Sequence, residues 1–153
     1  MAYHIHSDGA CINNGLENAI ASWSYIVTDD NNTVVQASTG RVIGQQDNNR
    51  AELTAFINAL QYVSSNKGNY IIHVDYQALY LYCNGKASPK ANRDLYREIS
   101  RLMMRCGNRF IVAKVEAHKA RSGISNFING VVDKLARRSI EYFGVEGALK
   151  KAS

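Results

Sequence analysis

With 153 residues, the chain is long enough to bury a substantial core, and its formal net charge is +5. A composition of 46% hydrophobic and 20% charged residues excludes a disordered or fibrous protein and indicates a globular one. No apolar run approaches the ~20 residues of a membrane span, and no secretory signal is evident, so we expect a cytoplasmic protein without membrane association. The excess of basic residues permits a polyanionic partner.

The cysteines and the lack of linkers bound the domain organisation. Cys11, Cys83 and Cys106 are odd in number and far apart, which indicates reduced thiols rather than disulfides or a cysteine-based zinc site. No internal repeat or linker interrupts the chain. We therefore expect one monomeric domain over residues 1–153, with 144–153 as a loose tail.

The first part of the chain has the pattern of β-strands. Residues 2–8 alternate loosely, and residues 20–28 are rich in β-branched and aromatic side chains. The polar cluster at 29–32 is typical of a turn, and residues 33–42 form a further strand-like run. These three segments predict an antiparallel meander.

The pattern then changes to helices that alternate with strands. Apolar residues recur at helical spacing over 49–64, with Asn48 or Asn49 as the N-cap, and residues 70–75 form a short apolar strand. The remaining predicted elements are helices at 76–84, 92–105 and 127–142 and a strand at 109–115, with Asn92 capping the second of these helices. This order predicts an α/β fold with a five-stranded mixed sheet, a meander followed by parallel strands, flanked by helices.

Four carboxylates stand out against this background. Asp8 and Asp75 end predicted strands, whereas Glu52 and Asp133 lie in predicted helices. Ligands of α/β folds gather beyond the carboxyl ends of parallel strands, so the fold has a means of bringing these acids together. Like charges at contact distance repel strongly, and such a cluster therefore requires cations. Oxygen donors without a soft ligand suit Mg²⁺, with Mn²⁺ as a substitute.

The residues around these acids resemble the type 1 ribonuclease H family over about 3–140. The matching motifs are Asp-Gly-Ala-Cys at 8–11, Asn-Asn-Arg-Ala-Glu-Leu at 48–53, Asp75 followed by Gln77, and Asn129 followed by Asp133, Leu135 and Ala136. The resemblance implies a ribonuclease H-like fold. It also implies an endonuclease that cleaves the RNA strand of RNA–DNA hybrids with two divalent ions and leaves 5′-phosphate and 3′-hydroxyl ends.

The resemblance also implies roles for individual residues. Asp8, Glu52, Asp75 and Asp133 would bind the metal ions, and His118 would assist proton transfer or product release. The residues expected to contact the hybrid are Asn14, Asn48, Asn49 and Gln77.

The sequence departs from the family pattern at several points, one of which is Tyr76, which follows Asp75 where a small hydroxyl residue is common. The stretch from Asp75 to Leu95 is too short for the basic protrusion that some members use to grip substrate, and the segment from His118 to Asp133 is longer than in many members. Asp47 stands where members that grip a DNA phosphate often carry threonine, and an acid there should weaken that grip.

A pair of histidines accompanies the strand-end acids. His6 and His73 each lie two residues before an acid, and side chains at i and i+2 share one face of a strand. We expect the two imidazoles to lie side by side below the metal site as hydrogen-bond partners of its ligands. The alternative is that both are ordinary buried histidines.

A helical run of basic residues is a further candidate surface. Its members, spaced four apart, are Arg93, Arg97, Arg101 and Arg105. They form a stripe that is suited to track a nucleic-acid backbone. The alternative is a solvated face that pairs in part with Asp94 and Glu98.

Two other functions stay open at this point. One is a nuclease of the same fold that acts on double-stranded RNA or structured DNA. The other is a non-catalytic hybrid-binding module, although a chain that only bound nucleic acid would gain affinity by losing its clustered acids.

Overall fold

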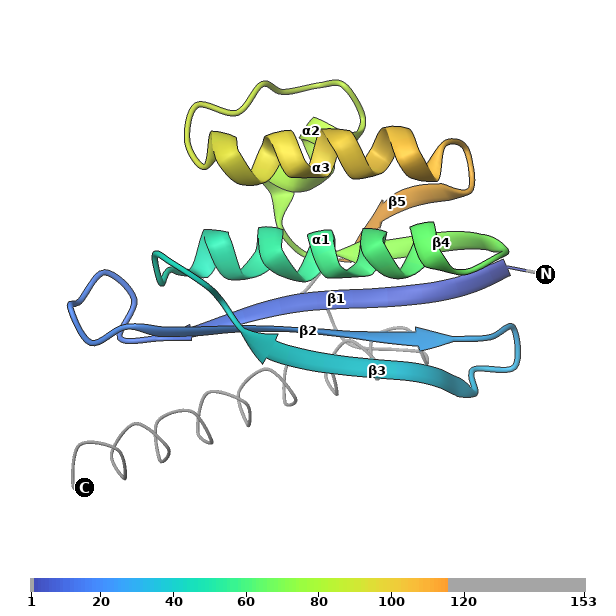
Figure 1. Ribbon diagram of the computed structural model, residues 1–153, viewed down its shortest axis with the longest axis horizontal. Coiled ribbons are helices and arrows are strands. Elements are labelled where there is room, and N and C mark those ends of the chain that lie inside the picture. The colour runs from blue at the N-terminus through green and yellow to red at the C-terminus, as the bar shows by residue number, and fades with distance from the viewer. Residues whose placement is uncertain (1, 116–153) are drawn as a thin grey trace.

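The computed structural model describes residues 2–115, and these residues form a sheet with helices (Figure 1). The predicted last helix at 127–142 and the tail at 144–153 lie outside the described residues. The elements are, in chain order, β1 (Ala2–Ile12), β2 (Ile20–Thr28), β3 (Val34–Arg41), α1 (Asn48–Ser65), β4 (Asn69–Val74), α2 (Gln77–Cys83), α3 (Arg93–Cys106) and β5 (Phe110–Lys114).

The sheet is five-stranded and mixed, with the order β3-β2-β1-β4-β5. β1, β2 and β3 form an antiparallel meander, whereas β4 pairs in parallel with β1 on one side and with β5 on the other. This confirms the predicted fold class. β1 is the central strand. The residues of β1 that come after its pairing with β4 therefore lie in the middle of the sheet.

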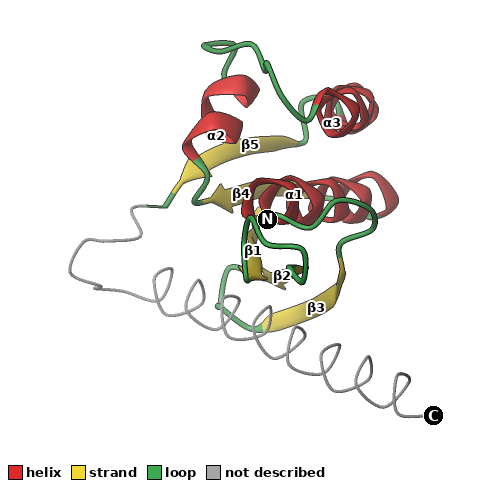
Figure 2. Cartoon of the chain, turned by 90° about the vertical axis from the view of Figure 1, so that its left-hand side faces the viewer, coloured by secondary structure: helices red, strands yellow, loops and turns green. Residues whose placement is uncertain are grey.

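The helices cover the sheet in layers (Figures 1 and 2). α1 contacts β1, β2 and β4, α3 packs against α1, and α2 lies against β4 and β5. The buried side of α1 carries the expected helical repeat, with Leu53, Phe56, Leu60 and Val63 fully buried among the strands and α3. None of the helices in residues 2–115 is long and apolar enough to span a membrane.

β1 continues past the position where we expected it to end. We predicted a strand over 2–8, but the strand runs to Ile12 and Gly9 pairs with Trp23 of β2. Gly9 lies against α1, because a Cβ on it would lie 2.4 Å from the carbonyl carbon of Ala51. The missing side chain lets the first turn of α1 approach the central strand.

The helix starts also differ in detail from the prediction. The N-cap of α1 is Asp47 rather than Asn48 or Asn49, and its Oδ1 accepts a hydrogen bond of 2.8 Å from the backbone N–H of Arg50. Asp caps as well as Asn does, so composition alone does not distinguish the three positions. Asn92 precedes α3 as predicted, but it has φ 55° and makes no side-chain cap hydrogen bond.

α3 buries one face against the rest of the core. Its buried residues are Tyr96, Ile99, Leu102 and Cys106, whereas Leu95 and Met103 are only partly buried. Tyr96 packs edge-on against Tyr82 of α2, at 4.7 Å between ring centroids.

Candidate active site

Two acids lie where the parallel pairing of β1 and β4 stops. The hydrogen-bonded register ends with His6 opposite His73. Asp8 follows two residues further along β1, and Asp75 comes directly after the last residue of β4. Asp8 therefore marks the end of the parallel ladder rather than the end of its strand. Its side chain is 7% exposed, and its Oδ1 accepts a hydrogen bond of 3.0 Å from the backbone N–H of Gly9.

A third acid reaches the same place from α1. Glu52 ends the first turn of that helix, and its backbone nitrogen would lie 2.5 Å from a Cβ on Gly9. The absence of a side chain at Gly9 thus allows Glu52 to lie beside Asp8, from a helix that the sequence separates by more than thirty residues from β1.

The electrostatics show that these carboxylates face one another. Burial raises the pKa of Glu52 well above its usual range, and the negative charge of Asp8 and a side-chain hydrogen bond with Asp8 raise it further. Asp75 also raises this pKa, whereas the backbone N–H of Gly9 lowers it. The nearby acid therefore disfavours the charged form of Glu52, as burial does.

The donor chemistry fits a hard divalent cation, although the ligand set is incomplete in the described part of the chain. Within residues 2–115 no three histidine, cysteine or acidic side chains are placed so that together they could hold a metal ion. The side chains of Asp8 and Glu52 hydrogen-bond to each other. Ionised carboxylates offer oxygen donors of the kind that Mg²⁺ prefers. The fourth predicted ligand, Asp133, lies outside the described residues, as does His118.

The four predicted substrate-contacting residues are exposed in the turn between β1 and β2 and at the starts of α1 and α2. Asn14, in the turn between β1 and β2, accepts a hydrogen bond of 3.0 Å at its Oδ1 from the backbone N–H of Asn48. Asn48 and Asn49 open α1 and are exposed, as is Gln77 at the start of α2. An exposed polar rim thus accompanies the partly buried acids.

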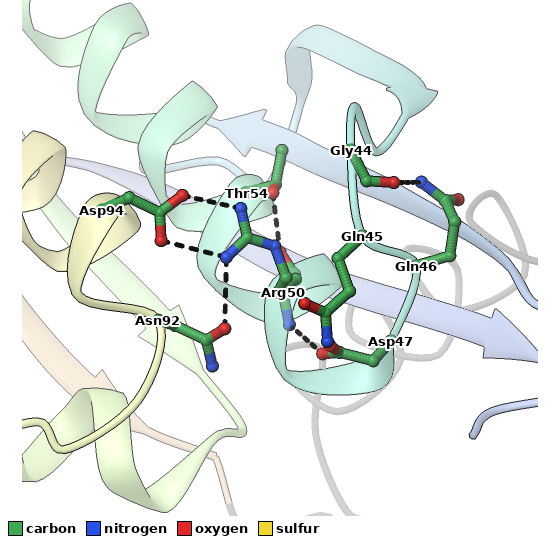
Figure 3. Close-up of polar contacts among 8 residues, drawn as sticks. All are labelled: Gly44, Gln45, Gln46, Asp47, Arg50, Thr54, Asn92 and Asp94. Carbon is green, nitrogen blue, oxygen red and sulfur yellow. Dashed lines mark hydrogen bonds and ion pairs between the residues drawn. The ribbon is translucent and has the colours of Figure 1, made fainter.

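A polar network beneath this rim connects α1 to α3 (Figure 3). Arg50 donates to both carboxylate oxygens of Asp94, at 3.0 and 2.8 Å, and to Oδ1 of Asn92 at 3.2 Å. The Asn92 side chain is therefore used by Arg50 instead of capping α3. Asp47 accepts a further hydrogen bond from Nε2 of Gln45 at 2.9 Å. The network holds the first turns of the two helices together.

The histidines form a larger group than the sequence predicted. The rings of His6 and His73 stack with centroids 4.3 Å apart and planes 5° from parallel. His4 joins them, since its Nδ1 lies 2.9 Å from Nε2 of His73. Burial, followed by the charge of neighbouring histidines, lowers the pKa of His6 to about 3 and that of His73 to about 4. Both rings are therefore neutral near pH 7.

Sequence reasoning missed one member of the histidine group. His4 was discernible from its i, i+2 relation to His6, which places it on the same face of β1. Tyr76, which follows Asp75, is a further neighbour of Glu52. Burial raises the pKa of Tyr76, and the charges of Asp47 and Glu52 raise it further.

The predicted basic stripe is exposed along α3, but its members differ in their partners. Arg101 donates to Glu98 at 2.5 and 3.1 Å, while Asp94 is bound by Arg50. Neither Arg93 nor Arg97 has an ion-pair partner within the described residues. Arg105 is likewise exposed at the end of the helix.

Several solved structures share this fold. The chain is similar to LC11-RNase H1, solved in complex with an RNA/DNA hybrid, with a TM-score of 0.74 and 18% identity over 92% of this chain and 97% of that one. It is similar to RNase H1 from the halophilic archaeon Halobacterium salinarum, with a TM-score of 0.72 and 20% identity over 92% and 98%. It is also similar to an N-terminal RNase H domain from Mycobacterium tuberculosis, with a TM-score of 0.72 and 22% identity over 92% and 99%.

No curated protein matches the chain. The family model described as RNase H matches residues 1–141, which include Asp8, Glu52, Asp75 and the predicted positions of His118 and Asp133. The chain therefore belongs to the RNase H family.

Proposed function

We propose that this chain hydrolyses the RNA strand of RNA–DNA hybrids with two Mg²⁺ ions, leaving 5′-phosphate and 3′-hydroxyl ends. The observation that carries the proposal is that Asp8, Glu52 and Asp75 lie near one another at the end of the β1–β4 ladder. The charges of Asp8 and Asp75 both raise the pKa of Glu52. Such an arrangement is unfavourable for a protein that only binds a polyanion, because the acids would repel the phosphates. It is favourable for one that holds cations between itself and a phosphate.

The acids of the chain would hold the ions, and Asp133 would complete the set with Asp8, Glu52 and Asp75. Two divalent ions held there would supply activation of a water and stabilisation of the leaving oxygen in an in-line displacement. The chain's own contribution is to position the carboxylates. β1 and β4 fix Asp8 and Asp75 through their register, and the close contact at Gly9 fixes Glu52. His118 would move a proton or help product to leave.

The rim residues support a duplex substrate. Asn14, Asn48, Asn49 and Gln77 supply exposed amide groups that suit base edges and 2′-hydroxyls of a minor groove. The net charge of +5 favours a polyanion. The hybrid bound by LC11-RNase H1 shows that a protein of this fold accepts such a duplex.

A cleavage assay with matched substrates tests the proposal. End-labelled RNA–DNA hybrid, double-stranded RNA and double-stranded DNA of one sequence would be incubated with the chain and Mg²⁺ or Mn²⁺. We expect cleavage of the RNA in the hybrid alone, and loss of at least ~100-fold of the rate in Asp75→Asn. Preferred cleavage of another duplex would change the substrate, and an equally active Asp75→Asn variant would refute the proposed mechanism.

A further inference from the structure

A cavity of about 390 Å³ lies between α2 and α3, outside the carboxylate site. Its lining combines two guanidinium groups with aromatic, proline and hydroxyl side chains: Tyr82, Pro89, Arg93, Tyr96, Arg97 and Ser100. Figure 2 shows α2 and α3 on the same side of the sheet, joined by the loop that contains Pro89. The cavity is thus built by the segment where the sequence lacks the family's basic protrusion.

The two arginines of the cavity are available to a ligand because the structure binds their acidic neighbours elsewhere. Asp94 is held by Arg50 of α1, and Glu98 is held by Arg101 of the following turn. Arg93 and Arg97, one helical turn apart and both exposed, make no ion pair within residues 2–115. Arg105 likewise makes no ion pair within residues 2–115, but of the four arginines only Arg93 and Arg97 line the cavity.

Among the described residues, those that line the cavity include no acid. Tyr82 packs edge-on against Tyr96, and its hydroxyl hydrogen-bonds to the Ser100 hydroxyl. Tyr96 is only 6% exposed, so its ring is not open to a stacking base. A surface with two free guanidiniums over a mostly covered aromatic floor suits a phosphate with its sugar better than an unstacked base.

The cavity is also close to the acids. α2 begins two residues after Asp75. α3 is held by its second residue, Asp94, to Arg50, which lies two residues before Glu52. Arg93 and Arg97 occupy the first turns of α3, the end of the helix that the pair of Arg50 and Asp94 joins to the start of α1.

We infer that the cavity between α2 and α3 is a second nucleic-acid contact, in which Arg93 and Arg97 bind the phosphate backbone of the hybrid duplex beyond the bond that is cleaved. The inference rests on the proposed function for the identity of the duplex. It assigns to this cavity the gripping that the missing protrusion does not supply. Arg101 and Arg105 are not part of the contact.

Salt-dependent binding with matched charge changes tests the inference. Fluorescence anisotropy would measure the dissociation constant of a blunt RNA–DNA hybrid in EDTA, which prevents metal-dependent cleavage, across a range of salt concentrations. The variants are R93Q/R97Q, the control R101Q/R105Q with the same charge change on the same helix, and R93K/R97K, which keeps the charge. Thermal unfolding would verify that each variant is folded.

We expect R93Q/R97Q to bind about 10-fold more weakly and to flatten the salt slope by about one for each arginine. R93K/R97K should keep the salt slope of the wild type. R101Q/R105Q should change the slope by less than half of the change caused by R93Q/R97Q. Equal effects of the two glutamine pairs would overturn the inference, because net charge rather than the cavity would then be responsible. The inference would also be overturned if R93Q/R97Q weakened binding only to a hybrid that carries a single-stranded extension.

A parallel cleavage assay of the wild-type chain with Mg²⁺ separates the two proposals. Absence of hybrid cleavage would refute the proposed function and leave the binding result to decide the cavity. Cleavage together with identical salt slopes for wild type and R93Q/R97Q would refute the cavity alone.

Discussion

Arg50 and Asp94 join the first turns of α1 and α3 through two parallel hydrogen bonds of 3.0 and 2.8 Å. The side chain of Arg50 is 13% exposed, while that of Asp94 is 64% exposed. Arg50 is therefore the buried partner of the pair, and Asp94 is the exposed one. Because Glu52 lies two residues from Arg50, this link helps to set the position of the helix that carries a candidate metal ligand.

Removing the guanidinium should loosen α1 at its start. We expect Arg50→Met to lower the free energy of unfolding by about 1–2 kcal/mol, since the hydrogen bonds to Asp94 and Asn92 are lost while the stem volume is kept. Urea unfolding measures the change. Arg101→Met is the control, because Arg101 is 56% exposed and pairs only within its own helix. Equal destabilisation by both variants would contradict a special role for Arg50.

The same link predicts an acid-dependent stability. The hydrogen bonds from Arg50, with its charge, lower the pKa of Asp94 from 3.8 to about 2. At a pH between these two pKa values, Asp94 is protonated in the unfolded chain but not in the folded one. The contribution of the Arg50–Asp94 pair to the free energy of unfolding is therefore complete above pH 3.8 and is lost as pH falls through 2. We expect Asp94→Asn to be less stable than wild type at pH 5, with a difference that shrinks towards pH 2. A difference that stays constant over this range, measured by urea unfolding, would contradict the prediction.

The contact at Gly9 predicts a severe effect of one methyl group. In Gly9→Ala, the new Cβ would meet backbone atoms of Ala51 and Glu52 at 2.4 and 2.5 Å, which cannot move away as a flexible side chain can. We expect a loss of about 3 kcal/mol of stability and a large loss of hybrid cleavage, because α1 must shift with Glu52.

Gly44→Ala is the matched control for this substitution. Gly44 has φ +89° and open space around its Cβ position, so alanine there is strained but meets no neighbour. We expect a cost of about 1 kcal/mol and little change in cleavage. Thermal unfolding and a cleavage assay on both variants compare the two effects, and similar behaviour would show that the approach of α1 is not critical.

The pair of Asp8 and Glu52 predicts a trade of stability against metal binding. Glu52→Gln removes one of two mutually repelling acids, so at pH 7 the metal-free variant should unfold at a higher temperature than wild type. Mg²⁺ should raise the unfolding temperature of wild type, because it binds only the folded acids, and should have little effect on Glu52→Gln. Calorimetry with Mg²⁺ and with Na⁺ at equal ionic strength tests this. An equal Mg²⁺ shift in both proteins would remove Glu52 from the metal site.

The stacked histidines predict an effect on metal use. If His6 and His73 support the ligands beside them, the H6F/H73F double variant should require about 10-fold more Mg²⁺ for half-maximal cleavage. His4→Phe is the control, because His4 touches His73 but lies four residues before Asp8. Unchanged Mg²⁺ dependence in the double variant would mean that the stack only fills space.

The local sequence was sufficient to predict most helices and strands and to predict which of some side chains lie next to each other. The change from period two to period 3.6 near residue 48 predicted where the meander ends and α1 begins, because the faces of strands and helices follow directly from backbone geometry. The parallel pairing of the strands that carry His6 and His73 brought the two rings together as expected. The roles of Asp8, Glu52 and Asp75 as metal ligands remain predictions, although the fold brings the three acids into electrostatic contact.

The tertiary structure decided whatever depends on how distant elements approach one another. The need for glycine at position 9 comes from α1, and the partner of Asp94 comes from 44 residues away, so that neither pattern is visible locally. The separation of the arginine stripe into paired and unpaired members follows from these same contacts. Periodicity is a property of one backbone segment, whereas a hydrogen bond or a steric contact between segments depends on their separation and register, which only the packed core determines.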